Sequence, residues 1–266
     1  MCGKNCRIFT AIVFAIVLLT VVYVIKLLSI FSYVPHQKVL SENEFGNIPK
    51  IMHQTWDTEE SIPDCCKKVI SQNRTLNPDW VYAFYSLDDR RSLIKNHFES
   101  HVLDAYDKLP NSTSLADMFR LCCLYVHGGM YMDVKSSCGD LSWLVHRVNG
   151  KLMYCKWPDP YPFFNHKHHA ATSFLLWPRH HPVLLHLIEE VVRRIARTST
   201  KEKKIFITHI TGPDMYAQVI CTHISMEHLC YTNNYFNGFF KHDGTYGEYY
   251  RYMKTRKLHW HQQLWK

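Results

Sequence analysis

The chain has 266 residues, of which 47% are hydrophobic and 14% aromatic, enough for one packed domain and a small appendage. Its formal net charge of +8 suits an anionic small molecule, a lipid headgroup or a nucleic acid. We exclude a nucleic-acid partner, because the sequence has no basic run interleaved with aromatic residues and no nucleic-acid-binding motif.

The N-terminal segment predicts a membrane helix. Residues 8–25 carry no charge and would span about 27 Å at 1.5 Å per residue. Lys4 and Arg7 precede this segment, which favours a cytoplasmic N-terminus. The alternative is a cleaved signal peptide, but the apolar run is longer than usual and no small-residue cleavage site closes it. We therefore expect a cytoplasmic tail (1–7), a retained transmembrane signal-anchor (8–30), a polar stem (31–47) and a lumenal domain (48–266).

Glycosylation sequences and cysteines agree with a lumenal domain. Two acceptor sequences, Asn73-Arg-Thr75 and Asn111-Ser-Thr113, are expected in loops. Cys2 and Cys6 lie on the predicted cytoplasmic side, where acylation is expected. Among the other eight cysteines no Cys-x-x-Cys pair occurs, which argues against a zinc ribbon, while Cys221 and Cys230 are close enough in sequence to bridge.

The rest of the chain alternates between strand and helix patterns. This alternation predicts an α/β fold with a mostly parallel sheet and crossover helices. Strands are expected at 50–55, 80–85, 130–134, 152–157, 172–177 and 205–213, the last running into a turn, and helices at 65–73, 93–106, 115–127, 182–197 and 214–222. Asp88 and Asp89 are expected to cap the helix that follows them, and Ser114 to cap the central helix.

The central helix and the strand after it bring together the residues most suggestive of function. Asp117 and Arg120 are three residues apart, so they share one helix face and can bond each other or a common ligand. Gly128 and Gly129 supply the positive φ that ends a helix. The next strand places Asp133 at its carboxyl end, where open α/β sheets bind ligands. Two acids and a guanidinium at one crevice would suit a polyhydroxylated, phosphorylated ligand.

This stretch resembles the Asp-x-x-Arg … Gly-Gly-x-Tyr-x-Asp-x-Asp signature of the glycosyltransferases with the sugar-binding region containing the DXD motif. That family includes the initiation-specific α-1,6-mannosyltransferases and the inositolphosphoceramide mannosyltransferases of fungi. Further segments of the chain have counterparts in the same order in the family: 48–56, 77–80, 81–89, 171–182, 211–213 and 259–265. The resemblance implies a GT-A-type, Rossmann-like fold behind one N-terminal transmembrane helix.

The resemblance also implies roles for individual residues. Asp117 and Arg120 match residues that bind the hydroxyls and phosphate of the donor sugar. Asp133 matches the first Asp of the DXD motif, which engages the ribose and a metal ion, Mn²⁺ or Mg²⁺. The end of the first strand carries an aromatic that stacks on the nucleotide base, which points to Trp56, although a Trp packed at a strand corner would look the same. The other residues placed at the donor site are His53, Gln54, His259 and Trp265.

Lys135 stands where the family has the second Asp of the DXD motif. An ammonium group cannot ligate a metal, so metal dependence is in doubt, and three alternatives are open. Lys135 can lie against the diphosphate as a fixed positive charge. A metal can be held by Asp133 and a histidine of the tail. Catalysis can also be lost, which would leave a nucleotide-sugar- or carbohydrate-binding pseudoenzyme. The histidines at 166, 168, 169, 180 and 181 show no metal-binding spacing on a helix face.

The reaction implied by the family is transfer of a hexose from a nucleotide sugar to a hydroxyl, with retention of configuration. Mannose from GDP-mannose is favoured, and UDP-hexoses are the rivals. The expected acceptor is a glycan or glycolipid. The expected setting is the Golgi membrane, as a single-pass type II protein that would have a small membrane regulatory partner. A lumenal structural protein is the third and weaker hypothesis.

Overall fold

The computed structural model describes residues 2–31, 48–149, 152–155, 170–199, 202, 207–224, 229–232, 249 and 251. The chain divides into two compact units, Met1–Val34 and Pro35–Lys266. The first unit contains helix α1 (Cys2–Phe31), in which Phe9–Leu28 is long and apolar enough to cross a membrane, with a mean hydropathy of 2.8. A signal sequence near the N-terminus would meet the same criterion of length and composition, so anchoring stays a prediction.

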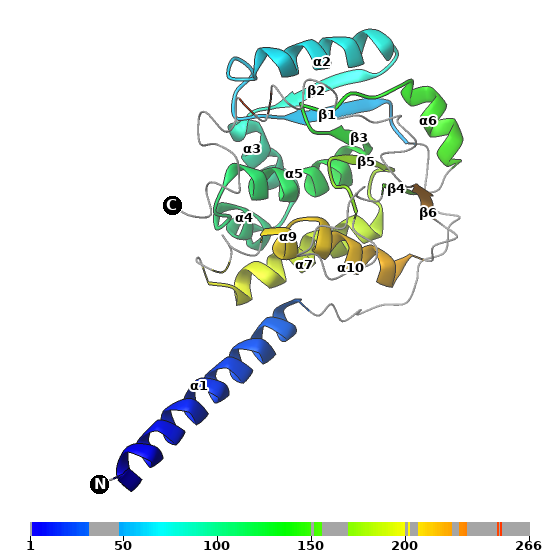
Figure 1. Cartoon of the computed structure of the whole chain (residues 1–266). Coiled ribbons are helices and arrows are strands. Elements are labelled where there is room, and N and C mark those ends of the chain that lie inside the picture. Colours follow the sequence, from blue (N-terminus) through cyan, green and yellow to red (C-terminus); the bar gives the residue numbers. More distant parts are fainter. Residues whose placement is uncertain are drawn as a thin grey trace. The chain divides into compact units, whose positions relative to one another are not determined.

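The second unit is built on a four-stranded sheet with the order β2-β1-β3-β5 (Figure 1). Strand β1 (Ile51–Thr55) pairs in parallel with β2 (Val81–Tyr85) and with β3 (Gly129–Met132). The edge strand β5 (Phe174–Trp177) runs antiparallel to β3. A separate parallel pair joins β4 (Leu152–Cys155) and β6 (Leu229–Thr232). The prediction of a mostly parallel sheet is confirmed, and the reversed direction of β5 was not predicted.

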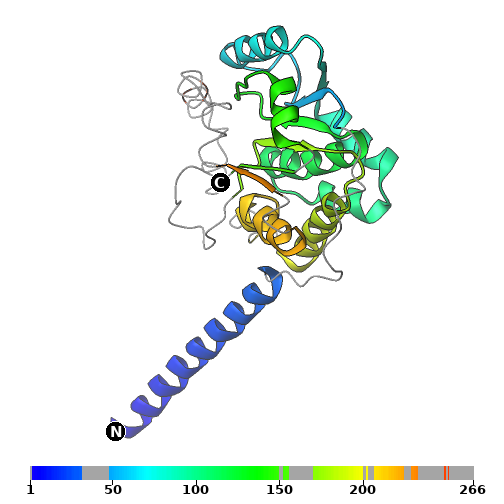
Figure 2. The ribbon, with the colours of Figure 1, turned by 90° about the vertical axis from the view of Figure 1, so that its right-hand side faces the viewer.

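Helices cover both faces of this sheet (Figure 1). Helices α2 (Asp64–Leu76) and α6 (Leu141–Val148) lie on one side, and α3 (Leu87–His97) and α5 (Ser112–His127) lie on the other. Beyond α5, helix α7 (Pro182–Arg197) packs against α4 (Ser100–Asp107), α9 (Ile207–Ile210) and α10 (Pro213–His223). Figure 2 shows α7 and α10 together on the same side of the sheet. This arrangement is the doubly covered architecture expected of a parallel sheet.

Strand alternation explains how the core is divided. Met52, Met130 and Leu176 face one side of the sheet and pack against Leu141 and Leu144 of α6. Burial of each such side chain contributes roughly 1.5–3 kcal/mol, so this layer helps to hold β1, β3 and β5 in register. The residues that alternate with these along the strands, such as His53 and Tyr131, lie on the opposite face of the sheet, toward α5.

Three predicted elements are corrected by the structure. The helix expected at 93–106 is two helices, because the chain is extended at Phe98, after α3. The strand expected at 205–213 is instead a helical turn over Ile207–Ile210, where two isoleucines three residues apart are both buried. The cap of the central helix is Asn111, whose side chain accepts from the Ser114 N–H. Asp89 does act at a helix start, through a capping box with Ser86.

Asn73 does not lie in a loop. It is part of α2 and is buried, with its Nδ2 donating to the Ser136 carbonyl (2.8 Å) and its Oδ1 accepting from Cys138 N (3.1 Å). A glycan on this amide is incompatible with that packing, so we withdraw Asn73 as an acceptor in the folded chain. The Cys230 side chain lies outside the described residues, so a Cys221–Cys230 bridge stays a prediction.

The junction between α5 and β3 requires glycine. Gly128 and Gly129 have φ of +65° and +97°, a region that other L-residues rarely adopt. A Cβ on Gly129 would lie 2.5 Å from the Ile51 carbonyl oxygen, and one on Gly128 would lie 2.6 Å from Arg179 N. The sharp turn therefore lets the helix pack against the sheet and still place Asp133 at the end of β3.

We expect Gly129→Ala to lower the free energy of unfolding by more than about 2 kcal/mol, because both the positive φ and the backbone contact are unfavourable for alanine. The measurement is urea unfolding of the detergent-solubilised full chain, followed by tryptophan fluorescence. Lys68→Ala, at an exposed position of α2, is the control. Equal unfolding midpoints for the two variants would contradict this account of the turn.

Candidate active site

The candidate site lies at the carboxyl ends of β1, β2 and β3, which share one edge of the sheet because these strands are parallel. A cavity opens there between the segment after β1, the start of α5 and the segment after β3. Among the described residues, its lining comprises Thr55, Trp56, Asp57, Arg90, Ser112, Thr113, Ala116, Arg120, Tyr131, Asp133, Val134, Lys135 and Tyr249. The predicted residues Arg120 and Asp133 thus meet at one cavity.

Asp117 and Arg120 form a buried ion pair on one face of α5. Arg120 Nη2 lies 2.9 Å from Asp117 Oδ1, and both residues are only 5% exposed. Thr211, before α10, donates its hydroxyl to Asp117 Oδ2 at 3.0 Å. Because burying either charge alone would cost several kcal/mol, the pair fixes both side chains. Asp117 therefore sits behind Arg120 and orients it, and only Arg120 of the two lines the cavity.

The Arg120 guanidinium is held on three further sides. Its Cζ lies 4.7 Å from the centre of the Tyr131 ring, in a cation–π contact. Its Nη1 donates to the Thr172 carbonyl, just before β5. Its Nη2 lies 3.5 Å from Asp133 Oδ1. Arginine suits this place because its planar group can bond several partners while stacking on a ring.

Asp133 is contacted by cations and by a hydroxyl. Lys135 Nζ lies 2.7 Å from Asp133 Oδ2, and the Tyr131 hydroxyl donates to Asp133 Oδ1 at 3.2 Å. The Lys135 ammonium also lies 5.4 Å from the centre of the Tyr249 ring. The Asp133 carbonyl accepts from Gln54 Nε2 at 3.3 Å. The carboxylate is thus held between two positive charges at the edge of the sheet.

Burial raises the pKa of Asp117 to about 6, and the neighbouring charge of Arg120 opposes this rise. Perturbed acids next to a cavity are typical of functional sites. The same burial raises the pKa of the Tyr131 phenol well above its ordinary range, so Tyr131 stays a hydrogen-bond donor to Asp133 at physiological pH.

The structure distributes the other predicted donor-site residues differently. Trp56 lines the cavity, donates its Nε1 to the Ser61 carbonyl at 3.1 Å and meets the Tyr249 ring edge-on. Gln54 is buried behind the cavity and supports the Asp133 backbone. His53 is fully buried, with its Nε2 2.8 Å from the Gly128 carbonyl oxygen, so it is not brought to the cavity. His259 and Trp265 lie outside the described residues.

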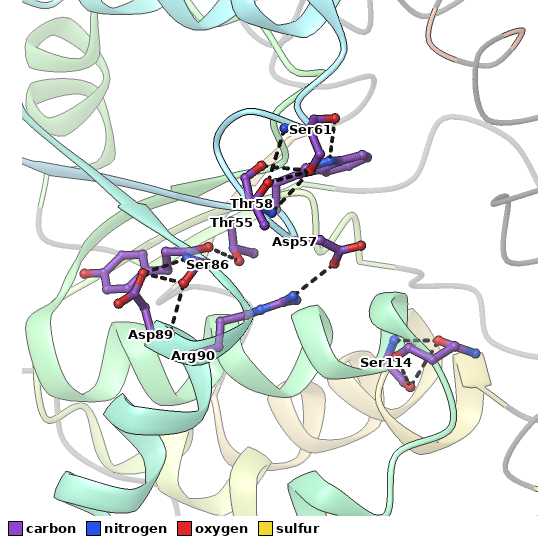
Figure 3. Close-up of polar contacts among 11 residues, drawn as sticks. Thr55, Asp57, Thr58, Ser61, Ser86, Asp89, Arg90 and Ser114 are labelled. Atoms are coloured by element: carbon purple, nitrogen blue, oxygen red, sulfur yellow. Dashed lines mark hydrogen bonds and ion pairs between the residues drawn. The ribbon is translucent and has the colours of Figure 1, made fainter. Parts of the chain in front are cut away.

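Several cavity residues were not predicted from sequence. Arg90 reaches the cavity from α3, and its partner Asp57 follows β1 (Figure 3). Tyr131 lies against Arg120, and Tyr249 lies against Lys135. The position of Asp57 two residues beyond a parallel strand was a usable signal. Arg90 gave none, because it stands in a run of charged residues typical of an exposed helix face.

A second and larger cavity, of about 570 Å³, lies against α2 and β2. It is lined by Glu59, Ile62, Lys67, Ile70, Ser71, Arg74, Thr75, Pro78, Trp80 and Tyr82. We assign the site to the smaller cavity, because the buried acids and the guanidinium groups gather there and the carboxyl ends of three strands point to it.

Residues 63–138, which contain Asp117, Arg120 and Asp133, match the family described as "Glycosyltransferase sugar-binding region containing DXD motif". This part of the chain is therefore similar to the sugar-binding region of that glycosyltransferase family.

Related glycosyltransferases from fungi and a virus agree with this assignment. Inositol phosphoceramide mannosyltransferase 3 of Schizosaccharomyces pombe is 34% identical over 39% of this chain and 29% of its own length. Inositol phosphoceramide mannosyltransferase 1 of the same organism is 26% identical over 75% of this chain and 61% of its length. An uncharacterized glycosyltransferase of Acanthamoeba polyphaga mimivirus is 36% identical over 34% of this chain and 37% of its own length. The matches thus span about a third of the length of the first relatives.

The fold agrees as well. The solved structure of the PaToxG glycosyltransferase superposes with a TM-score of 0.51 at 13% identity, covering 75% of this chain and 76% of that one. At that identity the likeness concerns the fold alone. It supports a mixed α/β fold for the part of the chain that it covers.

The described residues at the cavity do not fit a divalent metal. Across the described ranges, no three His, Cys, Asp or Glu side chains come together as a metal site. Both Asp133 oxygens face donors or cations, and Lys135 occupies the place of the second DXD carboxylate. His181 caps α7, while His166, His168 and His169 lie outside the described part. We therefore derive no catalytic step through a metal.

His53 offers a test of its structural role. Burial lowers its pKa to about 4, against an ordinary value of 6.5, so the folded protein keeps the ring neutral. Its contribution to stability is complete above pH 6.5 and is lost as pH falls toward 4. Between pH 7 and pH 5 this loss is about 2 kcal/mol, and His53→Gln should remove that part of the pH dependence. The measurement is the urea midpoint at both pH values, and equal slopes for wild type and variant would contradict the assignment.

Proposed function

We propose that the protein is a membrane-anchored retaining hexosyltransferase that moves a sugar from a nucleotide donor to a hydroxyl of a glycan or glycolipid. The observation that supports this most is the set of ion pairs that connects Asp117, Arg120 and Asp133. Asp117 is its buried end, and Asp133 at the other end lines the cavity. Such a set presents oriented donors and acceptors at a fixed place, as recognition of an activated sugar requires.

Within this proposal each side chain has a separate task. Arg120 binds the donor phosphate and sugar hydroxyls, and Asp117 and Tyr131 keep its plane fixed. Asp133 accepts from ribose or sugar hydroxyls while Arg120 and Lys135 balance its charge. Lys135 then stabilises the negative charge that develops on the departing diphosphate. Trp56 supplies an aromatic surface for the base.

The relatives suggest the substrates. Those from Schizosaccharomyces pombe are named inositol phosphoceramide mannosyltransferases, so we propose mannose from GDP-mannose as the donor and a glycolipid as the acceptor, with UDP-hexoses as the rival donors. Helix α1 would anchor the chain in the Golgi membrane with the second unit lumenal, beside a small membrane partner.

The second candidate is a catalytically silent nucleotide-sugar-binding protein. It is favoured by one contact, the 2.7 Å ion pair between Lys135 and Asp133, in which Lys135 stands in place of a carboxylate. A permanently neutralised Asp133 would still accept hydrogen bonds from a donor sugar. Binding without turnover is what distinguishes this candidate from the enzyme.

We expect Asp133→Asn and Arg120→Lys each to lower turnover by at least about 100-fold, because each removes an oriented charge from the site. The assay is nucleotide release from GDP-mannose and from UDP-hexoses by the full chain in detergent, with Lys68→Ala as the control. Calorimetric titration with the same donors accompanies it. Donor binding without nucleotide release would favour the silent protein. If the protein showed no donor binding and no nucleotide release, the proposal would be contradicted.

Lys135→Asp tests whether the lysine replaces a metal. If Lys135 stabilises the leaving diphosphate, the turnover of this variant in EDTA should be at least about tenfold lower than that of the wild type. Added Mn²⁺ should not restore it. Turnover that appears only with Mn²⁺ in the variant would show instead that Lys135 marks a degenerate metal site.

A further inference from the structure

Arg90 is a buried cation whose compensation within the protein is incomplete. Its side chain comes from α3 and is only 1% exposed. Its Nε has no hydrogen-bond acceptor among the described residues. A buried guanidinium normally needs carboxylates or carbonyls on most of its five N–H groups, because its desolvation is expensive. Arg90 nonetheless lines the cavity of the candidate site.

The acidic partner of Arg90 among the described residues is held loosely. Arg90 Nη2 lies 3.3 Å from Asp57 Oδ1, whereas charge-assisted N–H···O bonds are usually about 2.7–2.9 Å long. The Asp57 side chain is 51% exposed, so its carboxylate can turn into water at little cost. Figure 3 shows Arg90 extended from its helix toward Asp57, with that one ion pair drawn on its guanidinium.

A second anion-attracting feature faces the same cavity. Ser112 and Thr113, the first residues of the 16-residue helix α5, belong to its lining. The cap residue Asn111 accepts from the N–H groups of Ser114 and Leu115, which leaves the first two N–H groups of the helix without an acceptor among the described residues. The positive end of a helix dipole and free N–H groups bind phosphate.

We infer that Arg90, together with the first turn of α5, forms a phosphate subsite for which Asp57 is the resident stand-in anion. Phosphate would take the place of the Asp57 carboxylate on Arg90, and Asp57 would turn to solvent. This inference rests on the proposed function for the identity of the ligand, which is a phosphate group of the substrates. Two sources share that chemistry, the diphosphate of the donor and the phosphodiester of a charged acceptor.

The first experiment measures pyrophosphate binding to the full chain in detergent and EDTA by calorimetry, so it needs no turnover. Arg90→Gln should weaken binding by about tenfold or more, because it removes a charged donor. Arg91→Gln is the matched control, since it removes the same charge from the next position of α3, where Arg91 pairs with Asp107 on the surface. Equal losses in both variants would overturn the subsite.

Asp57→Asn should change pyrophosphate affinity in the opposite direction. This test leaves the buried Arg90 unchanged, so it does not depend on whether the protein tolerates a substitution there. Removal of the competing carboxylate should tighten pyrophosphate binding by about threefold or more, which a purely structural Arg90–Asp57 pair would not do. Unchanged or weaker binding in Asp57→Asn would overturn the inference even if Arg90→Gln failed to fold.

Kinetic measurements with the same variants then show whether the bound phosphate belongs to the donor or to the acceptor. A rise in donor KM in Arg90→Gln, with acceptor KM unchanged, assigns the subsite to the donor diphosphate. A rise in KM only for phosphate-bearing acceptors, and not for uncharged ones, assigns it to the acceptor. If the protein shows no turnover but pyrophosphate binding responds to Arg90 and not to Arg91, the subsite stands while the proposed function fails.

Discussion

The buried ion pair between Asp117 and Arg120 is the constraint on which the site depends. Neither charge is tolerable there alone, so the helix that carries both must pack as one unit with Thr211 on one side and Tyr131 on the other. Arg120 in turn ties α5 to the Thr172 carbonyl at the start of β5 and to Asp133 at the end of β3. One guanidinium thus fixes the relative positions of α5, the end of β3 and the start of β5.

Charge at and directly behind the described part of the cavity is organised as acid–cation pairs: Asp117 with Arg120, Asp133 with Lys135, and Asp57 with Arg90. The pairs differ in burial, from the first, which is almost sealed, to the last, whose acid is half exposed. This gradient separates a rigid part, in which Asp117 orients Arg120, from a part in which the Asp57 carboxylate is open to solvent. Under the proposed function, Lys135 would supply positive charge to a diphosphate at the position where the DXD pattern has a second carboxylate to hold a metal.

The sequence was informative where local rules and tertiary packing agree. The glycine pair, the shared helix face of Asp117 and Arg120 and the strand-end place of Asp133 each follow from periodicity and backbone geometry, and the sugar-binding region was identified from the same residues. The sequence was misleading where the burial of a side chain decides its structure or role. The apolar, β-branched residues around Ile207 favoured a strand, yet the packing selects a helical turn. Arg90 looks like a solvated charge, and only the three-dimensional structure shows it to be buried. His53 was expected near the carboxyl end of the first strand, but it lies in the middle of β1 and is buried toward α5, away from the cavity.

The reversed direction of β5 has a consequence for how such proteins diversify. Because β5 is antiparallel to β3, it starts at the same edge where the parallel strands end, and Thr172 and Ser173 bond Arg120 and the Asp133 N–H there. The start of β5 therefore lies beside Arg120 and Asp133 and holds both through backbone carbonyls. Because these bonds use the Thr172 and Ser173 carbonyls, the side chains at this edge can be exchanged without loss of the contacts to Arg120 and Asp133.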